Sequence, residues 1–142
     1  AISDYTKALK NYTKALKNNP KNYELTDGVI YVNRGVSKLN IEDFSGSIAD
    51  FTKAIELDLA NYNLRNAHYN RGMAKGFSED YNGAIADFDK AIEIDPNDAD
   101  AYKNRGIAKE NIGDLSGACA DWKYAENLGY QSQINLINDY CN

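Results

Sequence analysis

The sequence predicts an all-α solenoid built from repeated pairs of helices, and three observations support this prediction. A frame around Asn-Arg-Gly recurs at residues 31–38, 68–75 and 102–109. Apolar residues around each frame follow the three-and-four spacing of amphipathic helices. Only two prolines occur in 142 residues, so long helices are allowed almost throughout the chain. We therefore expect one domain over residues 1–142 in which helical pairs stack on one another.

Each expected unit contains a first helix (helix A), a short turn and a second helix (helix B). The turns are predicted near residues 40–43, 77–80 and 111–114. Three positions define the register: a glycine in helix A, then a small residue and an aromatic residue in helix B. They are Gly35, Ser47 and Phe51, then Gly72, Ala84 and Phe88, then Gly106, Ala118 and Trp122. A mid-helix glycine costs about 1 kcal/mol, so we expect it to let helix A pack closely on the small residue of helix B.

These spacings resemble the tetratricopeptide repeat, a helix-turn-helix unit of about 34 residues. Arginine stands where that family has leucine, and lysine where it has a later tyrosine. Because both departures recur in every unit, we interpret them as a variant of the family. The departing residues are Arg34, Arg71, Arg105, Lys38, Lys75 and Lys109. The resemblance implies a right-handed superhelix with full repeats at 28–61, 65–98 and 99–132.

Residues 1–22 match helix B of a repeat whose helix A is missing from this chain. The heptad YTKALKN occurs twice in residues 5–18, and the same seven-residue spacing occurs in helix B of the other units. Two heptads are too few for a coiled coil. The lysine stripe on this helix is either a solvated outer face, which we favour, or a membrane-surface face. We expect the chain to begin inside a longer solenoid, and an open end can self-associate.

Residues 131–142 are expected to form a cap helix over the last repeat, after Gly129 ends the preceding helix. If the cap runs antiparallel to that helix, with the pivot at Gly129 and Tyr130, Cys119 and Cys141 are neighbours. They form either a disulfide or, in a reducing compartment, two adjacent thiols. The sequence therefore leaves the compartment open: cytoplasmic by default, and extracytoplasmic if the pair is oxidised.

Charge and motifs argue against catalysis and nucleic-acid binding. Residues 1–22 carry a net charge of +4 and the remaining residues −9, so the body has no basic surface for phosphates. The sequence has no phosphate-binding Gly-Lys-Ser/Thr loop and no Cys/His cluster with metal spacing. The lone histidine, His68, occupies an aromatic packing position of the repeat family. We expect no enzyme activity, no cofactor, no metal site and no nucleic-acid partner.

An arginine of helix A and an aspartate of helix B recur in every unit. The expected pairs are Arg34 with Asp50, Arg71 with Asp87, and Arg105 with Asp121. Such arginines either form structural ion pairs or bind a ligand, and we favour the structural role. If a pair is buried, removing one partner should cost several kcal/mol.

The resemblance implies that the helices A line a concave groove that binds a peptide or protein partner. Helix positions three and four residues apart face the same side. The expected groove residues are Val29, Val32, Asn33, Val36, Asn40, Asn66, Tyr69, Asn70, Met73, Phe77, Asp100, Lys103, Asn104, Ile107 and Asn111. Asn33, Asn70 and Asn104 share one position, and this ladder either binds a peptide backbone or bonds neighbouring helices of the scaffold.

Some members of the family hold a C-terminal carboxylate with lysines and asparagines. Val32, Val36, Asp100 and Asn104 occupy those positions here, and only Asn70 matches, which argues against an acidic C-terminus of the chaperone type. The predicted function is a non-catalytic scaffold that binds a peptide or protein in the groove. The alternative is an assembly module that self-associates through its N-terminal helix. We expect no membrane contact.

Overall fold

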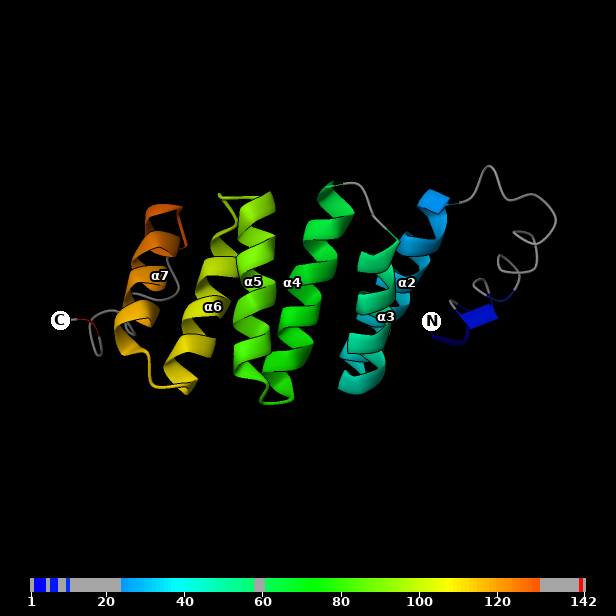
Figure 1. Cartoon of the computed structure of the whole chain (residues 1–142), viewed down its shortest axis with the longest axis horizontal. Coiled ribbons are helices and arrows are strands. Elements are labelled where there is room, and N and C mark those ends of the chain that lie inside the picture. The colour runs from blue at the N-terminus through cyan, green and yellow to red at the C-terminus, as the bar shows by residue number, and fades with distance from the viewer. Residues whose placement is uncertain are drawn as a thin grey trace.

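The fold is an all-α array of helical pairs, as the sequence predicts. A computed structural model describes residues 2–4, 6–7, 10, 24–57, 61–130 and 141. Six helices lie side by side in chain order (Figure 1): α2 (Glu24–Asn40), α3 (Phe44–Glu56), α4 (Asn61–Phe77), α5 (Tyr81–Ile94), α6 (Ala99–Asn111) and α7 (Leu115–Asn127). Most of the N-terminal half-repeat, and all of the expected cap helix but Cys141, fall outside these described residues.

Helices A are α2, α4 and α6, and helices B are α3, α5 and α7. The first two helices A contain 17 residues each, whereas α6 contains 13. Relative to the repeat frame, α2 and α4 therefore begin about one turn earlier than α6, because an α-helix has about 3.6 residues per turn. Without that extension, the pairs are alike.

An aspartate fixes the start of each helix B. Its carboxylate accepts a hydrogen bond from the backbone N–H three residues later, which belongs to a glycine in every unit. The pairs are Asp43 with Gly46, Asp80 with Gly83, and Asp114 with Gly117, at 2.9–3.0 Å. A Cβ on these glycines would lie 2.1–2.2 Å from the carboxylate. The motif Asp-x-x-Gly therefore encodes the cap, which stabilises a helix by about 1 kcal/mol.

The glycines of helix A face the aromatic residues of helix B. A Cβ on Gly35 would lie 2.8 Å from a ring carbon of Phe51, and one on Gly106 would lie 2.4 Å from the indole nitrogen of Trp122. The expectation that these glycines face the small residue of helix B was therefore incomplete. The aromatic ring needs the space, because it is fully buried and cannot retreat.

The array is concave on the side of the helices A. Within the described residues, α2 contacts α4 and α4 contacts α6, whereas α3 does not contact α5 and α5 does not contact α7. Neighbouring helices A are thus closer than neighbouring helices B, so each unit is wedge-shaped. Stacking wedges curves the row with the helices A inside.

Candidate functional site

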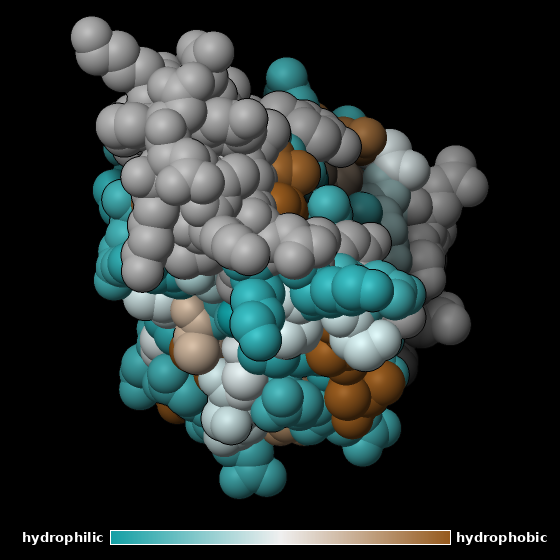
Figure 2. Space-filling view, turned by 90° about the vertical axis from the view of Figure 1, so that its right-hand side faces the viewer, coloured by the Kyte–Doolittle hydropathy of each residue, from teal (hydrophilic) through white to brown (hydrophobic). Residues whose placement is uncertain are grey.

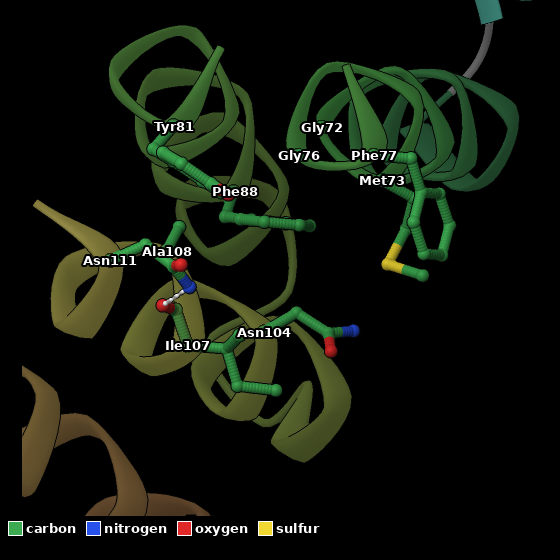
Figure 3. A pocket seen from close by; sticks show the side chains of 10 residues that line it. All are labelled: Gly72, Met73, Gly76, Phe77, Tyr81, Phe88, Asn104, Ile107, Ala108 and Asn111. Carbon is green, nitrogen blue, oxygen red and sulfur yellow. Dashed lines mark hydrogen bonds between the residues drawn. The ribbon is translucent and has the colours of Figure 1, made fainter. Parts of the chain in front are cut away.

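A pocket of about 290 Å³ opens among α4, α5 and α6 (Figure 3). Five of the predicted groove residues line it: Met73, Phe77, Asn104, Ile107 and Asn111. Sequence reasoning missed the other five, which are Gly72, Gly76, Tyr81, Phe88 and Ala108. Two of these, Gly72 and Phe88, belong to the repeat register rather than to a groove pattern. The glycines of α4 leave the space that a side chain would otherwise fill.

Apolar side chains form most of the pocket wall. In Figure 3, Met73 and Phe77 approach from α4, Ile107 from α6, and Phe88 closes the pocket from α5. Phe77 is 57% exposed and stacks on Phe44 with ring centroids 5.5 Å apart. Ile107 is 37% exposed. Large apolar side chains held in solvent beside a cavity are typical of interaction sites.

The expected asparagine ladder is not made of three equivalent amides. Asn33 is exposed. The Asn70 side chain donates a hydrogen bond to the backbone carbonyl of Asn66 at 2.9 Å. Asn104 donates to the hydroxyl of Tyr69 at 2.8 Å and so joins α6 to α4. Only the hydrogen bond between Asn104 and Tyr69 joins neighbouring repeats, as a scaffold role predicts.

The remaining expected groove positions differ in exposure. Val32 is buried in a cluster with Phe51, so its expected place in the groove was wrong, because α2 turns this position toward α3 and α4. Val36 packs against the same cluster. Asn40 is exposed, and Val29 is half-buried. The side-chain oxygen of Asn66 accepts a hydrogen bond from the preceding Arg65 at 2.8 Å, and the Lys103 ammonium donates to Tyr130 at 3.0 Å.

A buried aspartate binds both an arginine and a lysine of helix A in every unit. Asp87 accepts hydrogen bonds from Arg71 at 2.9 and 2.6 Å and pairs with Lys75 at 2.7 Å. We call these sets the triads: Arg34, Lys38 and Asp50; Arg71, Lys75 and Asp87; Arg105, Lys109 and Asp121. Sequence reasoning paired the arginines but gave the lysines no role. The missed signal was a lysine one helical turn after each arginine.

Hydrogen bonds in the triads favour the charged forms of Asp87 and Arg105. Burial raises the pKa of Asp87, but hydrogen bonds from His68, Arg71 and Lys75 outweigh burial and hold that pKa well below its usual range. His68 Nδ1 lies 3.1 Å from the carboxylate. The hydrogen bond to Asp121 raises the pKa of Arg105 well above its ordinary value despite partial burial.

The arginines also join neighbouring units. Arg71 donates to Thr52 of the preceding helix B at 3.0 Å, and Arg105 donates to Asp89 at 2.7 Å. Thr52 and Asp89 occupy the same register position, directly after the aromatic residue of helix B. One guanidinium therefore ties its own pair of helices together and ties that pair to the previous one.

The two cysteines join the chain end to α7. Cys119 and Cys141 form a disulfide with Cα atoms 5.5 Å apart. Cys141 packs against the buried cluster of Ala118 and Trp122. The described residues contain no group of three or more side chains suited to a metal ion. Among the helices of this described part, none is long and apolar enough to cross a membrane.

Comparisons with known proteins give two family matches and several structural neighbours. Residues 29–61 match a tetratricopeptide-repeat family model, and residues 78–113 match a second model described as a TPR repeat. A comparison with curated proteins finds no match to the sequence.

Solved structures of such domains superpose on this chain. The TPR domain of Arabidopsis OM64 superposes with a TM-score of 0.72 at 24% identity, covering 78% of this chain and 88% of that one. The first TPR of Spaghetti (RPAP3), bound to an HSP90 peptide, superposes with a TM-score of 0.71 at 20% identity, covering 81% of this chain and 88% of that one. The crystal structure of MamA superposes with a TM-score of 0.68 at 23% identity, covering 89% of this chain and 90% of that one. Repeat register, fold and family matches agree, and the chain contains tetratricopeptide repeats.

Proposed function

We propose that this chain is a non-catalytic scaffold that binds a peptide segment of a partner protein on its concave surface. Tetratricopeptide-repeat domains are protein-interaction modules. The observation that carries the proposal is the pocket among α4, α5 and α6, which leaves Phe77 and Ile107 exposed on that surface. The RPAP3 domain bound to an HSP90 peptide supports peptide binding by this fold.

The ligand differs in chemistry from an acidic C-terminus. A carboxylate needs cations, whereas Val32 and Val36 stand at two of the positions where other members of the family place a lysine and an asparagine. Asp100 stands at a third such position and is exposed. An incoming carboxylate would therefore find no cation at the first two positions and a like charge at the third, which raises its free energy at this surface.

The test is a selection from a random peptide library on the immobilised chain, followed by measurement of affinities for two variants. Ile107→Glu places a charge in the pocket wall. Leu115→Glu is the matched control, because Leu115 is 47% exposed and lies outside the pocket. We expect Ile107→Glu to weaken the selected peptides by about ten-fold or more and Leu115→Glu to leave them nearly unchanged.

Circular dichroism shows whether both variants keep the parent's helical content. The proposal is overturned if the parent selects no peptide, or if both folded variants bind as the parent does.

Exposed apolar side chains also occur away from the pocket. Figure 2 shows hydrophobic atoms in several places on the end of the array that faces the viewer, with a broad patch in its lower part, where the turns between helices A and B lie in Figure 1. Ile41 and Ile112 lie in such turns and are 64% and 45% exposed. Scattered apolar residues are normal on protein surfaces, so the pocket remains the better candidate.

The second candidate function is self-association through residues 1–22. Its support is the charge of this segment, +4 against −9 for the remaining residues. Opposite charges on two regions of one chain favour association between copies, and salt weakens it. Light scattering against protein concentration tests this: a mass that rises with concentration at low salt supports self-association, and a constant monomer mass contradicts it.

A further inference from the structure

Resting on the proposed function, we infer that the pocket holds one bulky apolar side chain of the partner segment, and that lysine or arginine residues flank this side chain. The inference names the chemistry of the ligand, which neither the family nor the fold specifies. It follows from the lining of the pocket, from the charges that the triads withdraw from the surface, and from the acids that lie just beyond the lining residues along the chain.

The lining admits an apolar group and disfavours a charged one. None of the ten lining residues is charged. An ion inside would lose its hydration with no opposite charge in reach, which costs several kcal/mol. The volume of about 290 Å³ lies just below the range for small-molecule sites, roughly 300–1,000 Å³. The pocket therefore suits a single large side chain.

The pocket also offers hydrogen-bond acceptors at its edge. Asn104 and Asn111 donate through their side-chain nitrogens to Tyr69 and to the backbone of Ile107. Within the described residues, no hydrogen bond reaches the side-chain oxygen of either amide. Those oxygens are acceptors for N–H groups of a bound backbone. A peptide supplies such donors on both sides of an inserted side chain.

The triads make the surface acidic by holding cations inside the array. Residues 28–57 and 63–130 contain sixteen acidic and eleven basic side chains. The triads contain six of the eleven bases but only three of the sixteen acids. Their lysine side chains are only 19–20% exposed. Outside the triads, thirteen acids face five bases. Such a surface attracts cationic segments and repels anionic ones.

Two acids lie just beyond the lining residues along the chain, one before those of α6 and one after those of α4. Asp100 lies one helical turn before Asn104 on α6, and its carboxylate is 56% exposed. The nearest cation, Lys103, is 3.8 Å away and also donates to Tyr130. Glu79 lies in the turn between α4 and α5, is exposed, and forms no ion pair with any described residue. Lysine or arginine on either side of an inserted side chain would meet these carboxylates.

Gly76 is a position from which the pocket can be filled, because it has room for a Cβ. A Cβ at this position would meet only the Cβ of Ala84, at 3.9 Å, which is an ordinary contact. Gly76 lines the pocket, so Gly76→Leu directs a bulky side chain into it, whereas Gly76→Ala adds one carbon. The pair separates occlusion of the pocket from a change of helix stability.

The experiment uses random twelve-residue peptides selected on the whole chain and then remade synthetically with a fluorophore. We expect the selected peptides to share one aromatic or long aliphatic residue with lysine or arginine within a few positions. Replacing this anchor by alanine, or filling the pocket with Gly76→Leu, should each weaken binding by about ten-fold or more. Gly76→Ala should stay within about three-fold of the parent.

Charge reversal tests the flanking residues. The double variant Asp100→Lys and Glu79→Lys should weaken peptides with basic flanks by about ten-fold at low salt and favour versions with glutamate flanks. High salt should reduce both effects.

The outcomes separate the two proposals. Failure to select any peptide overturns peptide binding itself, and with it this inference. Peptides that lose affinity for Ile107→Glu, but that lack basic flanks or bind Gly76→Leu as well as the parent, overturn only this inference.

Discussion

Replacing Asp87 by asparagine removes the negative charge of the middle triad without changing its shape. The carboxylate is 3% exposed and is held by Arg71, Lys75 and His68. An asparagine at this position keeps one acceptor oxygen but turns its NH₂ group toward groups that also donate. The two cations then share a site with no opposite charge.

The size of the effect follows from the burial of this triad. Breaking a buried ion pair by removing one partner costs about 3–5 kcal/mol. Because Arg71 and Lys75 are 16% and 20% exposed and can partly rehydrate, we expect a loss near the lower limit, about 3 kcal/mol. Native domains are stable by about 5–15 kcal/mol. The variant should therefore melt about 6–12 °C below the parent.

The assay is urea and thermal unfolding followed by circular dichroism. Glu93→Gln is the matched control, since it removes a carboxylate whose pair with Lys90 is fully on the surface, with Glu93 68% exposed. Such pairs contribute little to stability, about 0–1 kcal/mol. A loss below about 1 kcal/mol for Asp87→Asn, or equal losses for both variants, would refute the structural role that we assign to the triads.

The pH dependence gives a second check on Asp87. Its pKa lies below that of an aspartate in the unfolded chain, about 3.9. The stabilisation is therefore complete above the unfolded pKa and is lost as pH falls through the folded pKa. The difference in unfolding free energy between parent and Asp87→Asn should be constant above about pH 5 and shrink below about pH 4. A difference that stays constant in acid would contradict this assignment.

Three further predictions concern α4 and the turns. Gly76→Ala should raise the free energy of unfolding by about 0.5–1 kcal/mol, because its Cβ has room. Gly72→Ala should lower the free energy of unfolding by about 1–2 kcal/mol, since its Cβ would lie 2.9 Å from a buried ring carbon. Melting temperatures that shift in the same direction in both variants would contradict the assigned packing. Glu79→Gly should raise the free energy of unfolding, measured in urea, by about 0.5–1 kcal/mol, because a positive φ strains residues other than glycine. Glu79 has a φ of 65°, and the third unit has Gly113 at this position. Gly113→Glu should lower the free energy of unfolding, and no change in either variant would exclude strain at this turn. Burial raises the pKa of Tyr69 to about 12. The stabilisation by Tyr69 is therefore present below the ordinary tyrosine pKa and is lost as pH rises through the folded pKa. A near-ultraviolet titration of the parent, compared with Tyr69→Phe, should show this late ionisation, and an ordinary tyrosine titration would contradict it.

Local patterns predict most of the architecture because their causes are local. The turn at residues 41–43 separates α2 from α3 within one residue of its expected position. The Asp-x-x-Gly motif at residue 43 fixes that boundary through the contact of a carboxylate with a backbone N–H three residues later. Such contacts repeat wherever the motif repeats. Units of one sequence pattern therefore fold alike.

The candidate site is less predictable, because its residues come from three helices. A groove pattern on helix A finds Met73 and Ile107, but gives no indication of Tyr81 and Phe88 from helix B. The same pattern placed Val32 in the groove, although the neighbouring helices bury it. Helical spacing gives the side of the helix on which a side chain lies, whereas its exposure depends on which neighbouring helices pack against that side.

By itself, the sequence determined the repeat register, the all-α class, the turns between helices A and B and the pairing of arginine with aspartate, because each depends on spacing within one helical pair. Only the tertiary structure decided three features: the glycines face aromatic rings, the lysines complete the triads, and the asparagine ladder divides into different contacts. These depend on the distance and angle between helices. Close packing fixes that geometry through all side chains at once, so it cannot be found from the spacing of a few.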